Sequence, residues 1–447
     1  MKKCASRIVG LFLLLCGNVF AQVISLEQCI EIALENNSQI KLAANDARIA
    51  EHRTRQSKKD FMPQLLFSGN YKRQSMIPEI DIPAVELPLG EQKVPLFPGE
   101  QFTLGSLDTY DFRLNLSQPL FTGFKLKNKT NSLSARANSK SYDLAAVRSE
   151  VIYKVVNGFA SVLKAEKFLD IAVSSLGQVE SHLRDTEAFL NQGLARRNEL
   201  LVVKVKESEA QLAVLQARNA VEIAKAALEA LLGKPLPDSS LFQGPDLVGI
   251  REVQPDSSLE LAFRSRPELK SVELLQQSAR FAEKAMRGNR LPNIVAIGSY
   301  GYGKPGLDLV NDEWMDYWVV GVNAEWSLWS WGKTSSQIQQ AQLQTQSVEE
   351  VIRQTRLGIE LDVRQACSKV NEALQRKQVA QQFVERAGET LRVISSSYKQ
   401  GAASNTEYLD AQADLTRAQL QKAQAEIDCL CAYADWQRAV GVNAHQQ

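Results

Sequence analysis

The clearest pattern in the sequence is a stripe of apolar residues with helical spacing in its last third. From residue 359 to residue 398, apolar side chains recur at steps of three and four, interrupted once at Lys377. This spacing is that of a coiled-coil seam, and its many alanines indicate helices that approach one another closely. The seam consists of Ile359, Val363, Ala366, Val370, Ala373, Ala380, Val384, Ala387, Leu391, Ile394 and Tyr398.

A second long helix is expected from about Lys125 to Asn191, a stretch that contains no proline. At 1.5 Å per residue it would be roughly 100 Å long, which is more than a compact domain requires. Both long helices end just before a glycine, Gly193 or Gly401. Glycine is the residue that most readily adopts the left-handed conformation at a helix end. We therefore expect each helix to turn there and return as a helical hairpin.

Other segments alternate between apolar and polar positions, as β-strands do. In residues 317–329, Trp318, Val320 and Val322 share one face, and residues 111–118 alternate in the same way. Segments of about ten residues with one apolar face are typical of outer-membrane strands. The loop at 76–107 contains five prolines and is expected to be extended, and the loop at 304–316 is shorter.

The chain repeats itself in the same order. Residues 190–233 align without gaps with residues 398–441, and 13 of these 44 positions are identical. Further matches are "PLFTGFK" with "SLWSWGK", "MPQLLFSGNY" with "LPNIVAIGSY", and "SLEQCIEIALENN" with "SLELAFRSRPEL". Each half therefore reads as a helix, two strands and a long helical hairpin. We expect a first repeat at 22–232, a linker at 233–257 and a second repeat at 258–447.

The first 21 residues have the features of a secretory signal peptide. Lys2, Lys3 and Arg7 precede a short apolar run that ends at Ala21. Cleavage is expected after Ala21, and lipidation of Cys16 is the alternative. Beyond this segment no apolar run is long enough for a membrane-spanning helix, so insertion in a membrane would require a closed β-barrel.

Composition and motifs do not indicate an enzyme. The chain has 52 basic and 51 acidic residues, a balance that does not favour nucleic acid as a partner. "GYGKPG" at 301–306 has the spacing of a dinucleotide-binding motif but is followed by a loop and not by a helix. Cys429 and Cys431 point to different sides of a helix. We expect no catalytic residues, no cofactor and no metal.

Two acidic residues follow the second turn. In "YKQGAASNTEYLDAQADL" (398–415), Glu407 and Asp410 lie three residues apart and therefore on one helix face. The corresponding stretch of the first repeat has Glu199, but Val202 stands in place of the second acid.

Together these residues resemble the TolC-like outer-membrane efflux channel family. The resemblance rests on the two copies of the helix, strand and hairpin motifs and on Tyr398, Gly401, Glu407 and Asp410, and it covers essentially the whole chain after the signal. It implies a homotrimer with a 12-stranded barrel in outer-membrane lipid and a 12-helix tube in the periplasm. A periplasmic adaptor protein and an inner-membrane pump would dock at the hairpin tips.

The resemblance also implies roles for the residues at the tips. Glu407 and Asp410 would line the periplasmic aperture, where six carboxylates from three chains would attract cations and raise some of one another's pKa values. Family members often have a basic or hydroxyl residue just after the turn glycine, which holds the tip shut, but here Gly401 is followed by Ala402 and Ala403. The expected tip and adaptor residues are Gly193, Leu194, Ala195, Arg196, Arg197, Gly401, Ala402, Ala403, Ser404 and Asn405.

The fold expected is a mixed α+β membrane protein, with a coiled-coil tube and an antiparallel barrel completed by trimerisation, each chain giving four strands. Its function would be the outer-membrane channel of a tripartite efflux system. Two alternatives remain: the duct of a one-step protein secretion system, and a structural periplasmic coiled coil without a barrel.

Overall fold

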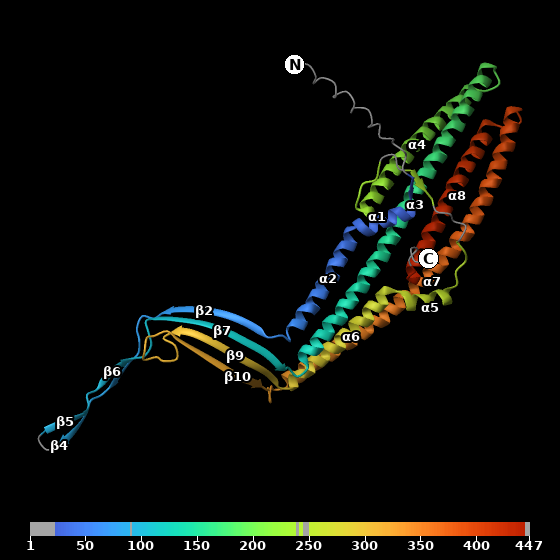
Figure 1. The fold of residues 1–447 in the computed structure, drawn as a ribbon. Helices are drawn as coiled ribbons and strands as arrows, with labels where there is room; N and C mark the ends of the chain where they lie inside the picture. Colours follow the sequence, from blue (N-terminus) through green and yellow to red (C-terminus); the bar gives the residue numbers. More distant parts are fainter. Residues whose placement is uncertain (1–22, 90–91, 238–240, 245–249, 443–447) are drawn as a thin grey trace, which may run out of the picture. The chain divides into compact units, whose positions relative to one another are not determined.

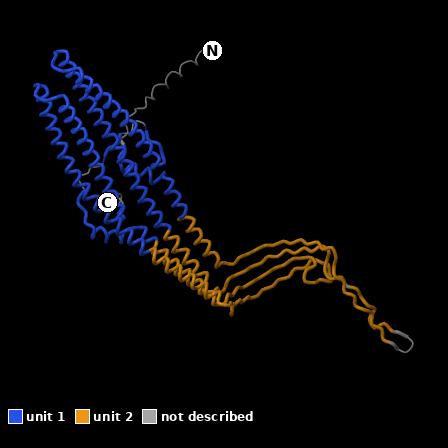
Figure 2. Tube along the Cα trace, turned by 180° about the vertical axis from the view of Figure 1, so that it is seen from behind, with its two compact units in different colours: residues 1–46, 140–271, 352–447 blue, residues 47–139, 272–351 orange. Residues whose placement is uncertain are grey.

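The computed structural model describes residues 23–89, 92–237, 241–244 and 250–442. The predicted signal peptide and its cleavage site at Ala21 lie outside these ranges. The chain divides into two compact units, which Figure 2 distinguishes by colour. The first comprises residues 1–46, 140–271 and 352–447, and the second comprises residues 47–139 and 272–351.

Two helical hairpins form most of the first unit (Figure 1). The first consists of α3 (Lys125–Asn191) and α4 (Arg197–Leu232), and the second of α7 (Lys333–Lys399) and α8 (Asn405–Val440). Helices α3 and α7 each have 67 residues, and α4 and α8 each have 36. Every boundary in the second hairpin equals its counterpart in the first plus 208. Helix α3 spans the range expected from the sequence.

Shorter elements pack against these hairpins. They are β1 (Val23–Ser25), α1 (Leu26–Asn36), β8 (Leu241–Gln243) and α5 (Pro255–Ser265), while α2 (Ser38–Lys59) and α6 (Pro267–Arg287) follow α1 and α5. Strands β1 and β8 pair in parallel, a contact that the sequence did not predict. The hydrophobic core beneath them contains Cys29, Phe159, Leu228 and Leu232, all fully buried.

The predicted seam of α7 is buried over its first part. Ile359, Val363, Ala366 and Val370 are at most 2% exposed, because they pack against α5, α6 and α8. Later positions such as Val384 and Leu391 are half-buried. The stripe therefore faces neighbouring helices, as its spacing predicted.

The second unit contains a sheet of four antiparallel strands in the order β10-β9-β7-β2. The strands are β2 (Gln64–Arg73), β7 (Asp108–Phe121), β9 (Asn293–Lys304) and β10 (Met315–Glu325), and a 3-10 turn (Gly288–Arg290) precedes β9. Strand β10 ends four residues before the predicted limit at residue 329. The indole of Trp326 instead donates a hydrogen bond to the backbone oxygen of Arg290 (3.0 Å).

The proline-rich segment between β2 and β7 is extended, as expected, and forms a two-stranded ribbon (Figure 1). Its inner ladder joins β3 (Glu79–Ile82) to β6 (Glu100–Thr103), and its outer ladder joins β4 (Val85–Leu89) to β5 (Gln92–Phe97). Within the described part of the chain, no helix is both long and apolar enough to cross a membrane.

Candidate functional site

The two hairpin ends share one backbone geometry. Gly193 and Gly401 have φ angles of 77° and 73°, in the left-handed region that a side chain disfavours. The N–H of Leu194 donates to the oxygen of Phe189 at 2.8 Å, and that of Ala402 donates to the oxygen of Ser397 at the same distance. Both predicted turn glycines therefore end a long helix. Gly193, Leu194, Ala195 and Arg196 form the first turn, Gly401, Ala402, Ala403 and Ser404 form the second, and Arg197 and Asn405 begin the returning helices.

The second turn is fastened to α8 by a capping box. The Ser404 hydroxyl accepts a hydrogen bond from the Glu407 N–H (3.3 Å), and Glu407 Oε2 accepts one from the Ser404 N–H (2.7 Å). The hydroxyl of Ser404 also donates to Glu407 Oε2 at 2.9 Å. The first turn has no such cap, because Arg196 makes no side-chain bond to α4. Ser404 thus fixes the direction in which α8 leaves the tip.

The same hydrogen bonds keep the carboxylate of Glu407 charged. The backbone N–H of Ser404, and then its hydroxyl, lower the pKa of Glu407 below its ordinary value. Crowding between chains is expected to raise some of the pKa values at this ring. Within one chain the local effect at Glu407 has the opposite sign.

Asp410 lies one helical turn beyond Glu407, and both side chains are exposed. Asp410 borders a groove of about 430 Å³ whose lining also includes Lys206, Glu209 and Arg417. The structure thus places both predicted acids at the end of α8 next to the turn, where their charges are accessible to solutes.

A buried hydrogen bond joins the two hairpins close to their ends. The side chains of His182 on α3 and Asn405 on α8 meet at 2.6 Å, with His182 Nε2–H donating to Asn405 Oδ1. His182 is 2% exposed and Asn405 is 7% exposed. Asn405 was expected at the surface of the tip, but its side chain is buried and hydrogen-bonded to His182.

Aromatic and apolar side chains enclose this hydrogen bond. The His182 ring stacks on Tyr408 with centroids 4.0 Å apart, and Tyr398 lies 5.0 Å away. Val179, Val203 and Leu409 form a buried cluster beside them. Burial lowers the pKa of His182, although the bond to Asn405 and the charge of Asp185 act in the opposite direction. The imidazole is therefore held neutral where the two hairpins meet.

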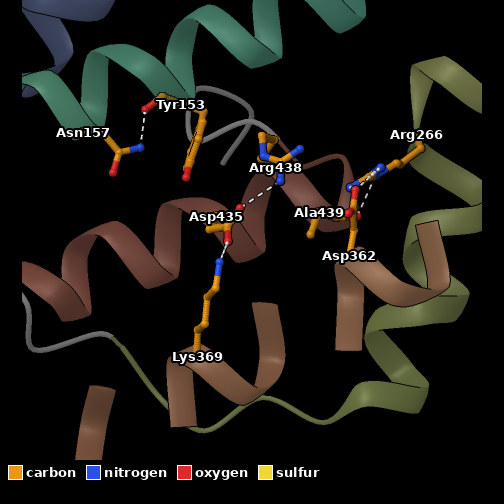
Figure 3. A network of polar contacts seen from close by, with 8 residues as sticks. All are labelled: Tyr153, Asn157, Arg266, Asp362, Lys369, Asp435, Arg438 and Ala439. Atoms are coloured by element: carbon orange, nitrogen blue, oxygen red, sulfur yellow. Dashed lines mark hydrogen bonds and ion pairs between the residues drawn. The ribbon is translucent and has the colours of Figure 1, made fainter. Parts of the chain in front are cut away.

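A second polar connection lies farther along the hairpins (Figure 3). The carboxylate of Asp435 on α8 accepts from Lys369 of α7 (3.0 Å) and from Arg438 (2.9 Å), whose guanidinium lies 5.0 Å from the Tyr153 ring of α3. Burial acts to raise the pKa of Asp435, but hydrogen bonds and charges from Arg438 and Lys369 leave it below its ordinary value. This charged group connects three of the four long helices.

The sheet has one largely apolar face and one mixed face that carries most of its polar side chains. Directly opposed residues of antiparallel strands lie on the same face, so the register of the strands assigns each side chain to a face. Trp318 and Val320 on the apolar face are 72% and 74% exposed. The apolar face contains Leu65, Phe67, Tyr71, Phe112, Leu114, Leu116, Tyr300, Tyr302, Trp318, Val320 and Val322. The opposite face is mixed. It contains the polar residues Ser68, Asn70, Asp111, Arg113, Asn115, Ser299 and Asn323 together with Leu66, Val295, Ile297, Tyr317 and Val319.

The described residues include no group of three or more histidine, cysteine, aspartate or glutamate side chains arranged to hold a metal ion. Burial raises the pKa of the Cys431 thiol to about 11, which disfavours the thiolate that metals bind.

Two features of the tip were missed in the sequence. The capping box was readable, since Ser404 and Glu407 have the S-x-x-E spacing that precedes a helix. The contact between His182 and Asn405 had no such signal, because these residues lie 223 positions apart.

Comparison with known proteins gives consistent results. A family model described as "Outer membrane efflux protein" matches residues 29–234 and 259–442. The alkaline protease secretion protein AprF of Pseudomonas aeruginosa is 22% identical over 450 residues, covering 99% of this chain and 89% of AprF. The outer membrane protein TolC of Vibrio cholerae is 22% identical over 344 residues, covering 74% of this chain and 77% of that protein. The solved structure of CusC has a TM-score of 0.79 at 17% identity, covering 94% of this chain and 92% of that chain.

Proposed function

Because this chain belongs to the outer membrane efflux protein family and is an outer-membrane efflux channel, we propose that three copies of it close a single pore. In this proposal each copy contributes four strands to a 12-stranded barrel and two hairpins to a 12-helix tube in the periplasm. The observation that supports this proposal most directly is the four-stranded sheet, which has an exposed apolar face and two open edges.

The open edges require partners if the sheet lies in lipid. Strands β2 and β10 are the two edge strands in the described structure. A backbone group left unpaired in a bilayer costs several kcal/mol, so a membrane sheet must be closed. Outer-membrane barrels have eight strands or more, and three copies of this sheet supply twelve. The apolar face, which includes Trp318 and Val320, would then face lipid, and the mixed face with Arg113 and Asn115 would line the pore.

Equivalent hydrogen bonds at the two hairpins support the proposal that each chain contributes two copies of the same helical unit to the tube. Asn37, between α1 and α2, donates to the oxygen of Leu231 (2.8 Å), and Arg266, between α5 and α6, donates to the oxygen of Ala439 (2.7 Å). The two acceptors lie 208 positions apart, which is the shift that relates the helix boundaries. This equivalence supports repeats at 22–232 and 258–447, joined by a linker at 233–257, although β8 and the start of α5 fall within that linker.

The tips would form the aperture and the docking site. Glu407 and Asp410 of three chains would ring the narrow end of the tube and attract cations. A periplasmic adaptor protein, which connects to an inner-membrane pump, would contact the exposed turn residues. The exposed ones are Gly193, Leu194, Arg196, Gly401, Ala402 and Ser404 of the turns and Arg197 at the start of α4; Ala195 and Ala403 are half-buried, and Asn405 is buried.

One-step protein secretion is a second candidate function. It is supported by AprF, a relative named for alkaline protease secretion that matches 99% of this chain. The two functions differ in what accumulates when the gene is deleted: a small toxic molecule in the cell, or an unsecreted protein. The structural coiled coil considered above does not account for a sheet with an exposed apolar face.

Single-channel recording tests the aperture. The parent protein is expected to prefer cations in a salt gradient, and Glu407→Ala/Asp410→Ala is expected to lose most of that preference. Glu199→Ala is the matched control, because Glu199 occupies the position of Glu407 in the first repeat. Equal selectivity in all three proteins would reject these two acids as the aperture.

A further inference from the structure

The ribbon between β2 and β7 is amphipathic in both of its ladders. In the inner ladder, Ile80 is paired with Phe102, and Glu79 and Asp81 belong to the opposite face. In the outer ladder, Leu87 is paired with Val94, and Glu86 is paired with Pro95 on the opposite face. Each ladder therefore has one apolar side and one side that carries acids.

The apolar sides are uncovered in a single chain. Leu87 and Val94 are 44% and 45% exposed, and Ile80, Ile82 and Val85 are exposed as well. An isolated two-stranded hairpin is at best marginally stable in water, since it buries little apolar surface. A covering surface for these residues would stabilise the ribbon.

The position of the ribbon and its prolines indicate which surface can cover its apolar sides and by which type of contact. The ribbon continues from β2, an edge strand whose open side would meet the neighbouring copy, so each copy would carry its ribbon beside that seam (Figure 1). Pro95 within β5 and the flanking Pro83 and Pro98 do not donate backbone hydrogen bonds, which disfavours strand addition along the ribbon's edges. Contact through the side-chain faces is then the available mode.

The distribution of charge fits contact between copies. Glu79, Asp81 and Glu86 all lie on the polar sides, so apolar sides of neighbouring ribbons can meet while these acids stay in water. Glu100, paired with Ile82, is the exception, and it lies at the end of its ladder next to Gly99. We propose that the ribbons of the three copies converge and pack together through their apolar sides, at the end of the barrel away from the helices. This inference rests on the trimer proposed above.

Cysteine variants on the two sides of one strand test this contact. Leu87→Cys and Val94→Cys place a thiol on the apolar side, and Glu86→Cys, next to Leu87, is the matched control on the polar side. Among the described residues, the natural cysteines Cys29, Cys367 and Cys429 are buried and Cys431 is partly buried, so the parent protein serves as the blank. The full chain is purified in mild detergent, oxidised, and analysed on non-reducing gels.

The proposal predicts covalent dimers for Leu87→Cys and Val94→Cys and few for Glu86→Cys. It also predicts that a water-soluble maleimide labels the apolar-side thiols at least about tenfold more slowly than the control thiol, because a covered thiol reacts slowly. If all three variants form trimers but cross-link and label to the same extent, the ribbon contact is wrong, whereas the proposed pore still stands. Monomers would overturn the pore itself. Slow labelling without cross-links, together with quenching of a label at residue 87 by a nitroxide lipid, would assign the apolar side to lipid and reject the contact between copies.

Discussion

The hydrogen bond between His182 and Asn405 predicts how the tip is held closed. We expect opening of the aperture to separate the two hairpin ends of a chain, so this contact would belong to the closed state. In His182→Ala or Asn405→Ala, the remaining buried partner loses its hydrogen bond, which costs about 1–3 kcal/mol. A difference of that size changes the ratio of open to closed channels by roughly 5–150-fold.

The assay is the open fraction in single-channel recordings from a planar bilayer. Both variants should be open far more often than the parent. Ser175→Ala is the matched control, because the Ser175 hydroxyl also bridges the hairpins, to Thr416 at 3.3 Å, but lies outside the aromatic cluster. Open fractions for His182→Ala and Asn405→Ala that match the parent would show that this hydrogen bond does not hold the tip closed.

The same contact should respond to acid. Because burial lowers the pKa of His182 from its ordinary value of 6.5, a proton binds more tightly once the ring is released from the closed tip. The stability of the closed tip is therefore complete above about pH 6.5 and decreases as the pH falls below it. Asp185, Tyr398 and Tyr408 are the other titratable groups beside the ring, from α3, α7 and α8. The parent should open on acidification, whereas His182→Gln, which can still donate to Asn405 but does not titrate, should not show this response.

Three further perturbations follow from the same structure. Ser404→Ala removes the capping box and should lower the stability of the hairpin by about 1 kcal/mol, seen as earlier exchange of the amides at the start of α8. Asp435→Asn weakens the bonds that the buried carboxylate makes with Lys369 and Arg438. Because both cations keep access to water, it should lower the free energy of unfolding by about 1.5–3 kcal/mol in denaturant titrations. Asp414→Asn, which breaks an exposed pair with Arg417, should change it by less than about 1 kcal/mol. Bulky insertions within residues 194–198 or 402–406 should abolish transport while trimers persist, and loss of trimers on gels would mean that the turns serve assembly instead.

The sequence predicted the elements whose signals are local and repeated. Gly193 and Gly401 marked both helix ends, and the seam from Ile359 to Val370 is buried. Strand β10 was predicted too long because Trp326 and its neighbours continue the alternation of apolar residues, while in the structure the Trp326 indole binds Arg290 and the ladder ends. Pairing of β1 with β8 was not predictable, since strands of three residues are too short to show a period of two.

At the candidate site too, residues with a local sequence signal could be predicted and residues that meet through helix packing could not. Glu407 and Asp410 were found from their spacing after the turn, but the capping role of Glu407 was overlooked although its pattern was visible. His182 and Asn405 carry no local signal, because their meeting depends on how two hairpins pack side by side. For Asp435 the i,i+3 pair with Arg438 is local, but the contact with Lys369 of α7 likewise depends on helix packing.

We propose that three copies of this chain close one channel. The most direct test of this proposal is the mass of the full-length protein, purified in mild detergent and measured by native mass spectrometry. If the barrel is closed by trimerisation, the particles contain three chains. Particles of a single chain would contradict the proposal, since four strands cannot close a barrel.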